Sequence, residues 1–320
     1  MSHDFRTFGI AVVAAAVLVS LTGQPAFAQG TPWIAEPGTG TISFTYANQS
    51  AKEFWRPVDG TVTKVTGPLG PTGASLAQNT MWFGANYAVN DFVALDIQSA
   101  FASSMVSGAV GPSGGQESYS GLFDSNVALT FRLVDELISD APSVAVRIGG
   151  ILAGAYDTGY INSLGDGGHG VETSLIVGKF GNAAGFSAEV GLRMRGSTDV
   201  NTQAVGGAMA SGETVDIPND MFVNLGLFIP AGSAVTLGVD YRMVNAMSGI
   251  DIGGMGFSPS RFPGLEEDAH IVGGRLLANV TDTVNLNVFF GQVVAGKNTA
   301  ASRIFGAGIG FGFGGGGFDF

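Results

Sequence analysis

Apolar and polar residues alternate along most of this chain with a period of two, the spacing of a β-strand with two different faces. Residues 81–89 place an apolar or aromatic side chain at every second position. Asn90-Asp91 follow as a short polar stretch, and the alternation resumes over 93–101. Two alternating runs joined by a tight polar connection predict a β-hairpin.

The same alternation recurs down the chain, in about twelve segments. The predicted strands lie near 40–48, 77–89, 92–103, 119–133, 144–157, 170–180, 186–196, 219–229, 235–246, 268–280, 284–295 and 303–320. Ten or fourteen strands remain alternatives, because boundaries taken from a pattern shift by ~2–4 residues. In the fourth segment the apolar face runs from Phe123 to Phe131, and in the fifth it runs from Val144 to Tyr156.

The connections between these segments sort into two classes of length. The short ones are Asn90-Asp91, 181–185, 230–234 and 281–283, with 134–143 the longest of this class. The long ones, rich in Gly, Ser and Pro, lie near 49–77, 103–118, 158–169, 197–218 and 247–267. Short turns on one side and long loops on the other are typical of outer-membrane barrels.

Composition indicates what such strands build. Charged residues make up 12% of the chain, about half their usual share in soluble domains, while the apolar share of 45% is ordinary. No apolar run after residue 28 is long enough for a transmembrane helix, and strands cross lipid only as a closed barrel. The sequence therefore predicts an all-β fold, a transmembrane antiparallel up-and-down β-barrel.

The first 28 residues have the pattern of a cleaved signal peptide. Arg6 precedes an apolar core over 10–21, and Ala26-Phe27-Ala28 has the small-x-small form that a signal peptidase cuts. A retained N-terminal anchor is the alternative. We expect residues 1–28 to be removed during export by the secretory route and residues 29–320 to form the barrel, in the outer membrane of a Gram-negative bacterium. The chain has no cysteine.

The last ten residues, FGFGGGGFDF, carry two aromatic rings two positions apart, at Phe318 and Phe320. A last strand that ends in Phe resembles the assembly signal of Gram-negative outer-membrane barrels. This resemblance implies that the chain meets the barrel-assembly machinery and outer-membrane lipid, with both rings at the periplasmic rim. A flexible low-complexity tail is the alternative for the glycine run.

The opening of the mature chain, with Trp33, Gly38, Gly40 and Tyr46, together with the strand rhythm and the terminal Phe, resembles the meta-pathway phenol-degradation family. That family is loosely related to porin-like transporters of long-chain fatty acids and toluene. The resemblance implies a transporter of hydrophobic compounds. The long N-terminal hatch of the fatty-acid transporters is not visible, because only residues 29 to about 40 precede the first strand, and no binding residue is carried over.

The polar faces of the strands place charges of both signs in the predicted lumen. The charged set is Asp96, Asp124, Arg147, Glu172, Glu189, Arg193, Arg195, Asp240, Arg242 and Arg275. Charges at that depth require water or partners. One interpretation is an aqueous path, and thus a channel or transporter that passes small solutes. The alternative is a lumen filled by Arg–carboxylate networks, and thus a structural or adhesive barrel.

Arg193 and Arg195 are the sharpest local feature of that set. Because they lie two apart on one strand, both guanidinium groups face the same side and could grip a carboxylate or phosphate of a passing solute. The alternative is a ladder of ion pairs to Glu172 or Asp240 on neighbouring strands.

Other chemistry finds less support in the sequence. A net charge of −12 without a basic cluster argues against a nucleic-acid partner, and no cofactor is expected. An outer-membrane lipid hydrolase is a remote alternative, resting on His270 or His169 with a nearby serine, and we expect no enzyme. Acidic loop residues could hold calcium, although solvated loop charge is the simpler interpretation: Asp157, Asp166, Glu213, Asp216, Glu266, Glu267 and Asp268.

Overall fold

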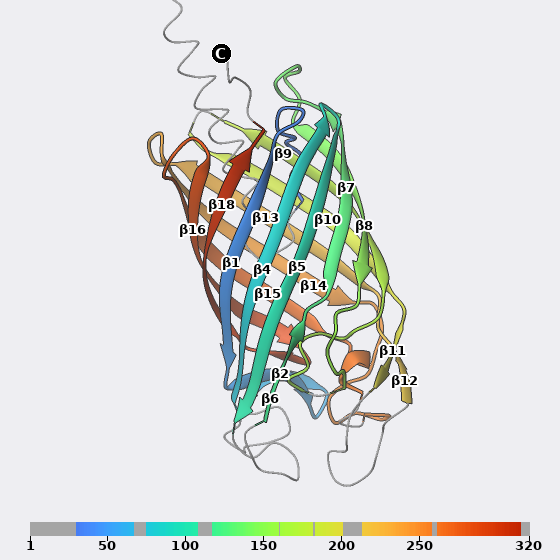
Figure 1. Ribbon diagram of the computed structural model, residues 1–320. Helices are drawn as coiled ribbons and strands as arrows, with labels where there is room; N and C mark the ends of the chain where they lie inside the picture. The colour runs from blue at the N-terminus through green and yellow to red at the C-terminus, as the bar shows by residue number, and fades with distance from the viewer. Residues whose placement is uncertain are drawn as a thin grey trace, which may run out of the picture.

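A computed structural model describes residues 30–66, 75–107, 117–159, 161–181, 183–200, 213–257 and 261–314 of the chain. Its main sheet closes on itself, because β4 pairs with β1 on one side and with β5 on the other (Figure 1). Thirteen strands form this sheet, and β6 and β7 share one place beside β5. The fold is therefore a closed antiparallel β-barrel of twelve strands, as the sequence predicts.

The strands of the barrel are long, and consecutive ones are neighbours. They are β1 (Gly40–Ala51), β4 (Ser75–Asn90), β5 (Val93–Ser107), β6 (Glu117–Leu122) with β7 (Ser125–Val134), β8 (Ser143–Leu152), β9 (Gly170–Phe180), β10 (Gly185–Arg195), β13 (Asp220–Pro230), β14 (Val235–Ala246), β15 (Asp268–Asn279), β16 (Val284–Lys297) and β18 (Arg303–Phe313). Smaller elements lie in the connections: β2 (Glu53–Val58), β3 (Thr61–Thr66), β11 (Ser197–Val200), β12 (Glu213–Asp216), β17 (Thr299–Ala300) and the 3-10 helix η1 (Phe262–Gly264).

The two ends of the barrel differ, and we name them by their connections. The turn end carries the short turns, the start of β1 and the end of β18, at the top of Figure 1. The loop end carries the long connections, including the β2–β3 and β11–β12 hairpins. The predicted sorting of connections by length is thus confirmed.

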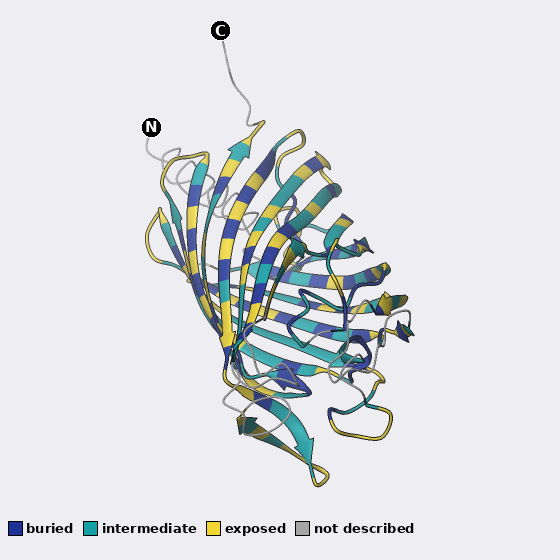
Figure 2. Cartoon of the chain, turned by 60° about the horizontal axis from the view of Figure 1, so that its bottom comes forward, coloured by how far each residue is buried: buried dark blue, intermediate teal, exposed yellow. Residues whose placement is uncertain are grey.

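The strands expose apolar side chains outward and turn polar ones inward. On β1, Ile42, Phe44 and Tyr46 are exposed, while Ser43 and Thr45 between them are buried. Figure 2 shows this alternation on strand after strand. An apolar outer surface around a polar interior is the reverse of a soluble domain, and it is the arrangement by which a barrel contacts lipid.

Within the described ranges, no helix is long and apolar enough to cross a membrane.

Three predicted strand boundaries are wrong. Residues 119–133 do not form one strand, because pairing is interrupted at Phe123 and Asp124 between β6 and β7. The fifth strand ends at Leu152 rather than 157, since Ala155 turns back to pair with Leu122. The last strand ends at Phe313, where Gly314 takes a left-handed φ of 79° against the backbone of Gly38.

Two predicted features lie outside the described residues. Phe318 and Phe320 belong to 315–320, and the signal peptide over 1–28 belongs to the undescribed N-terminal stretch. Both stay predictions.

Candidate functional site

The charged side chains of the lumen gather on β8, β9 and β10. Arg147 on β8 forms an ion pair with Glu172 on β9, and its second nitrogen donates to Asn126 Oδ1 at 2.7 Å. Both side chains are buried. The two positions lie diagonally across a strand pair, Glu172 facing Gly149, so alternation alone brings them to the same inner face.

Glu189 on β10 holds a second set of hydrogen bonds at the same depth. Its carboxylate accepts from Ser174 Oγ at 2.7 Å and from Asn224 Nδ2 at 2.8 Å. It also accepts from the backbone N–H of Gly30 at 3.0 Å. Gly30 lies ten positions before β1. Because it is hydrogen-bonded to Glu189, the chain before the first strand reaches into the middle of the barrel.

Arg193 and Arg195 face the same side but engage different carboxylates. Arg195 makes a 3.0 Å ion pair with Asp124 and donates to the carbonyl of Gly167 at 3.0 Å. Arg193 is held less closely: its Nε lies 3.4 Å from Asp220 and 3.8 Å from Glu172. The guanidinium of Arg193 stacks over Phe222, 5.0 Å from the ring centroid. The ladder to Glu172 is therefore present, and Asp240 takes no part in it.

Asp124 explains why the wall is interrupted where it is. At the break between β6 and β7 its carboxylate turns inward and accepts from Gly154 N at 3.0 Å and from Tyr156 Oη at 2.6 Å. The loop after β8 is thereby folded into the barrel. Burial, reinforced by Asp124, raises the pKa of Tyr156, so this hydroxyl stays a donor. Tyr156 thus lies inside, where the sequence pattern had placed it on the outer face.

The remaining predicted lumen residues lie apart from this group. Asp240 pairs with Arg275 at 3.0 Å between β14 and β15. Asp96 on β5 accepts from Asn86 Nδ2 at 2.7 Å and from Thr130 Oγ1 at 3.1 Å. Arg242 on β14 lines the same cavity as Arg193 and Arg195.

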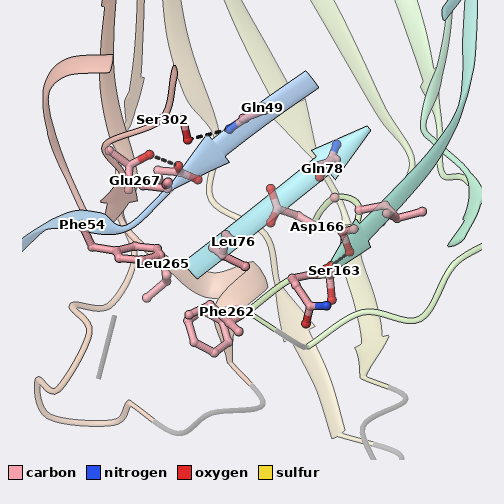
Figure 3. A pocket seen from close by; sticks show the side chains of 18 of the residues that line it. Gln49, Phe54, Leu76, Gln78, Ser163, Asp166, Phe262, Leu265, Glu267 and Ser302 are labelled. Atoms are coloured by element: carbon pink, nitrogen blue, oxygen red, sulfur yellow. Dashed lines mark hydrogen bonds between the residues drawn. The ribbon is translucent and has the colours of Figure 1, made fainter. Parts of the chain in front are cut away.

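Two adjoining cavities occupy the lumen towards the loop end. The inner cavity, about 410 Å³, lies at the level of Arg193, Arg195 and Arg242. The outer cavity, about 320 Å³, lies among the loops and is lined by side chains such as Phe54, Leu76 and Phe262 (Figure 3). The residues common to both linings are Gln49, Gln78, Phe123, Gly165, Asp166, Glu267, Thr299 and Ala300. The two cavities therefore meet at one shared boundary.

Two loop carboxylates, Asp166 and Glu267, stand at that boundary. Glu267 is exposed to the cavity but surrounded by the loops, and this enclosure, with Asp166 nearby, raises its pKa to about 7. Enclosure likewise raises the pKa of Asp166 to about 6, while Arg195 opposes that rise. Thr299 donates to Glu267 at 2.5 Å and partly offsets the shift. The boundary thus holds two groups that titrate near neutral pH.

At the turn end, the ring of Trp33 lies buried against the barrel wall. Its ring packs against Phe180 and Phe228, with centroids 4.3 and 5.7 Å away. Its indole Nε1 donates to Glu136 Oε1 at 2.6 Å. Glu136, in the turn after β7, also accepts from the backbone of Phe180 at 2.9 Å, so one carboxylate ties wall and segment together.

The rest of the segment before β1 crosses the same opening. Ile34 packs on Ala88 and Ala94, on the wall formed by β4 and β5. The backbone of Gly38 donates to Ala88 O at 2.8 Å and fixes the entry to β1. We call residues 30–39 the N-terminal plug. Sequence reasoning expected no hatch because the segment is short, although a buried-type Trp33 beside Pro32 before the first strand was a signal for it.

The residues considered for a hydrolase or a calcium site make other contacts in the structure. His270 Nδ1 lies 2.7 Å from Tyr241 Oη, and His169 Nδ1 accepts from the backbone of Ala153 at 3.2 Å. Among the residues that the structure describes, no group of three or more acidic or histidine side chains could hold a metal ion. Glu213 instead pairs with Arg261, and Glu266 pairs with Lys297 at 2.9 Å.

Comparison with known proteins supports the fold. No protein-family model matches the sequence, and no curated protein matches it. The structure is similar to the COG4313 outer membrane channel from Pseudomonas putida F1, with a TM-score of 0.67 and 12% identity over 90% of this chain and 100% of that one. It is also similar to the translocator domain of the autotransporter NalP from Neisseria meningitidis, with a TM-score of 0.50 and 11% identity over 96% of this chain and 95% of that one. The fold is one that outer-membrane proteins use.

Proposed function

We propose that this protein is an outer-membrane channel that passes small solutes through the barrel lumen. The observation that carries the proposal is the pair of adjoining cavities, which leads from the loops to the level of Arg193 between charged and polar side chains. A barrel of twelve strands lies between the filled eight-stranded kind and the open porins. It has room for a narrow path of this sort.

The same proposal sets the orientation of the barrel. The loop end faces the outside and the turn end faces the periplasm, as in other barrels with long and short connections. The exposed apolar face contacts outer-membrane lipid. Export follows the secretory route after cleavage near residue 28, and Phe318 and Phe320 present the assembly signal to the barrel-assembly machinery.

In this proposal the N-terminal plug is the constriction. Trp33 and Ile34 lie across the turn end, and Gly30 is hydrogen-bonded at mid-depth. A solute that has reached the inner cavity must pass this segment. Passage therefore requires the plug to shift or leave a gap beside it. The likeness in fold to a protein described as an outer membrane channel agrees with this assignment.

A structural or adhesive barrel is the second candidate, and one observation favours it. The pairs Arg147–Glu172, Arg195–Asp124 and Arg275–Asp240 brace the wall from within, as a filled lumen requires. The two candidates differ in a measurable property, because only the channel conducts ions.

The test is single-channel conductance of the refolded protein in a planar bilayer, with a variant that narrows the path. Ala269 is buried on β15 and lines the inner cavity, so Ala269→Phe fills part of that cavity. Ala307 is exposed on the outer face of β18, and Ala307→Phe is the matched control. We expect discrete openings for the wild type, smaller ones for Ala269→Phe, and wild-type openings for the control.

A bilayer that stays silent with protein shown to be folded by its heat-shifted electrophoretic mobility would reject the channel in favour of the structural barrel. Equal conductance in all three proteins would place the conducting path elsewhere.

A further inference from the structure

The inner cavity has one apolar wall. Trp82 on β4 and Phe123 line it with their rings 5.2 Å apart in an edge-to-face arrangement. Ala47 and Ile304 pack with Phe289 into a buried cluster that Trp82 and Ile271 extend. This wall spans β15, β16, β18, β1 and β4, which are consecutive in the ring. Its surface is suited to an apolar or aromatic body.

The facing wall carries arginines with carboxylates among them. Arg193 and Arg195 on β10 line the cavity across the ring from β1 and β4, and Arg242 lines it from β14. Glu172 and Asp124 also line it, and each is already paired with an arginine. Arg195 is closely held by Asp124 at 3.0 Å. Arg193 has carboxylates only at 3.4 and 3.8 Å, beyond the 2.7–2.9 Å usual for charge-assisted hydrogen bonds.

Arg193 is positioned to accept an additional partner. Its Nε is buried and makes no hydrogen bond to any part of the chain that the structure describes. Stacking on Phe222 fixes the plane of the guanidinium. Arg242 lies close enough for the two positive charges to repel, and Asp220, Glu172 and Glu189 offset part of that repulsion.

We infer that the inner cavity binds a small organic anion, with its carboxylate on Arg193 and its apolar or aromatic body against Trp82 and Phe123. This inference rests on the proposed channel function and names the class of solute that the channel takes. A volume of about 410 Å³ lies within the range of small-molecule pockets. Glu172 and Asp124 in the lining are already paired with arginines, so the open contact is that of Arg193, and an inorganic anion there would leave the apolar wall unused.

The test uses isothermal titration calorimetry of the folded full-length protein in detergent with three probes. Benzoate has both features, benzamide keeps the ring without the charge, and acetate keeps the charge without the ring. We expect benzoate to bind roughly tenfold or more tightly than either, because a hydrogen bond to a charged group contributes about 1.5–3 kcal/mol.

Variants assign the two contacts separately. Arg193→Gln should lower benzoate affinity about tenfold, to the level of benzamide, since it removes the charge-assisted contact. Arg193→Lys keeps the positive charge but not the planar guanidinium. Its benzoate affinity should lie between those of the wild type and Arg193→Gln. Trp82→Leu should weaken benzoate and benzamide alike. Arg303 is exposed on the outer face of β18, so Arg303→Gln is the control and should bind as the wild type does.

If Arg193→Gln does not fold, the comparison of Arg193→Lys with the wild type decides the question. Benzamide binding as tightly as benzoate, or undiminished benzoate binding by the folded Arg193 variants, would overturn the inference. Conductance measured on the same preparation separates the two proposals. Openings without selective benzoate binding leave a channel without this site, while benzoate binding without openings leaves the site in a barrel that does not conduct.

Discussion

The backbone amide of Gly30 donates a 3.0 Å hydrogen bond to the carboxylate of Glu189, which lies on the far wall of the barrel at mid-depth. Glu189 is almost fully buried, and it accepts from Ser174 and Asn224 as well. A buried carboxylate needs such donors, so the segment before β1 helps to satisfy a charge that the wall alone would leave with fewer partners. The N-terminal plug is thus bound to the lumen by polar contacts at one point and by Trp33 at another.

The first prediction concerns the anchoring of that plug. Trp33→Ala removes a buried ring and its hydrogen bond to Glu136, a loss of about 3–5 kcal/mol of docking energy by analogy with core truncations. We expect larger or more frequent openings in a planar bilayer, because the plug leaves the turn end more often.

Phe92 supplies the control for this experiment. It is an exposed aromatic residue in the β4–β5 turn, at the same end of the barrel. Phe92→Ala should conduct as the wild type does. Unchanged conductance in Trp33→Ala would mean that the plug does not limit passage.

The second prediction concerns the buried pair of Arg147 and Glu172. Arg147→Met leaves Glu172 buried, with Arg193 only at 3.8 Å, and should lower the free energy of unfolding by about 3–5 kcal/mol. The double variant Arg147→Met/Glu172→Leu should recover most of that loss, since apolar replacement of a whole buried pair is often neutral. Urea titration of the refolded barrel measures both. Equal losses in the single and double variants would contradict this account of the pair.

The sequence predicts the strands of the barrel wall far better than it predicts the segments that fold into the lumen. Period-two alternation indicates which face a residue takes, so nine of the twelve strands and the lumen side of Arg147 or Glu172 follow from it. The alternation gives the wrong face for Phe123 and Tyr156, because the wall is interrupted there and the loop turns inward to reach Asp124. Such a contact joins distant segments and has no local pattern.

The N-terminal plug and the shared boundary of the cavities cannot be predicted from the sequence for the same reason. Trp33 meets Glu136 across about a hundred positions, and Asp166 meets Glu267 across a similar span. These encounters are set by how the loops and the terminus fold over the openings. The apolar wall beside Trp82 likewise appears only when β1 pairs with β4 on one side and with β18 on the other.

The third prediction is a pH dependence at the boundary of the two cavities. Enclosure raises the pKa of Glu267 from 4.5 to about 7, and that of Asp166 from 3.8 to about 6. Between the ordinary and the raised values the closed loops bind more protons than open ones, so closure weakens as the pH rises. The contribution of the two groups to closure is complete below about pH 3.8 and is lost as the pH rises through about 7. Openings in the planar bilayer should therefore be more frequent at pH 8 than at pH 5.

Glu267→Gln tests this assignment because its side chain does not titrate. The variant should flatten the pH profile of the openings. Glu53 makes a half-exposed ion pair with Lys64 on the β2–β3 hairpin, so Glu53→Gln should keep the wild-type profile. A profile that Glu267→Gln leaves intact would move the titrating group away from this boundary.

The fourth prediction tests the outer face. Leu225 lies in the middle of β13 and is exposed, with Leu227 and Ile229 beyond it on the same side. If this face meets hydrocarbon, Leu225→Arg places a charge near the bilayer midplane and should lower the free energy of folding into lipid vesicles by about 2–4 kcal/mol. Met255 is fully exposed in the loop after β14, so Met255→Arg should have no such cost. The measurement is reversible urea unfolding in vesicles, followed by tryptophan fluorescence. A Leu225→Arg barrel as stable as the Met255→Arg one would mean that this surface faces water or another protein, and the lipid contact proposed above would then be wrong.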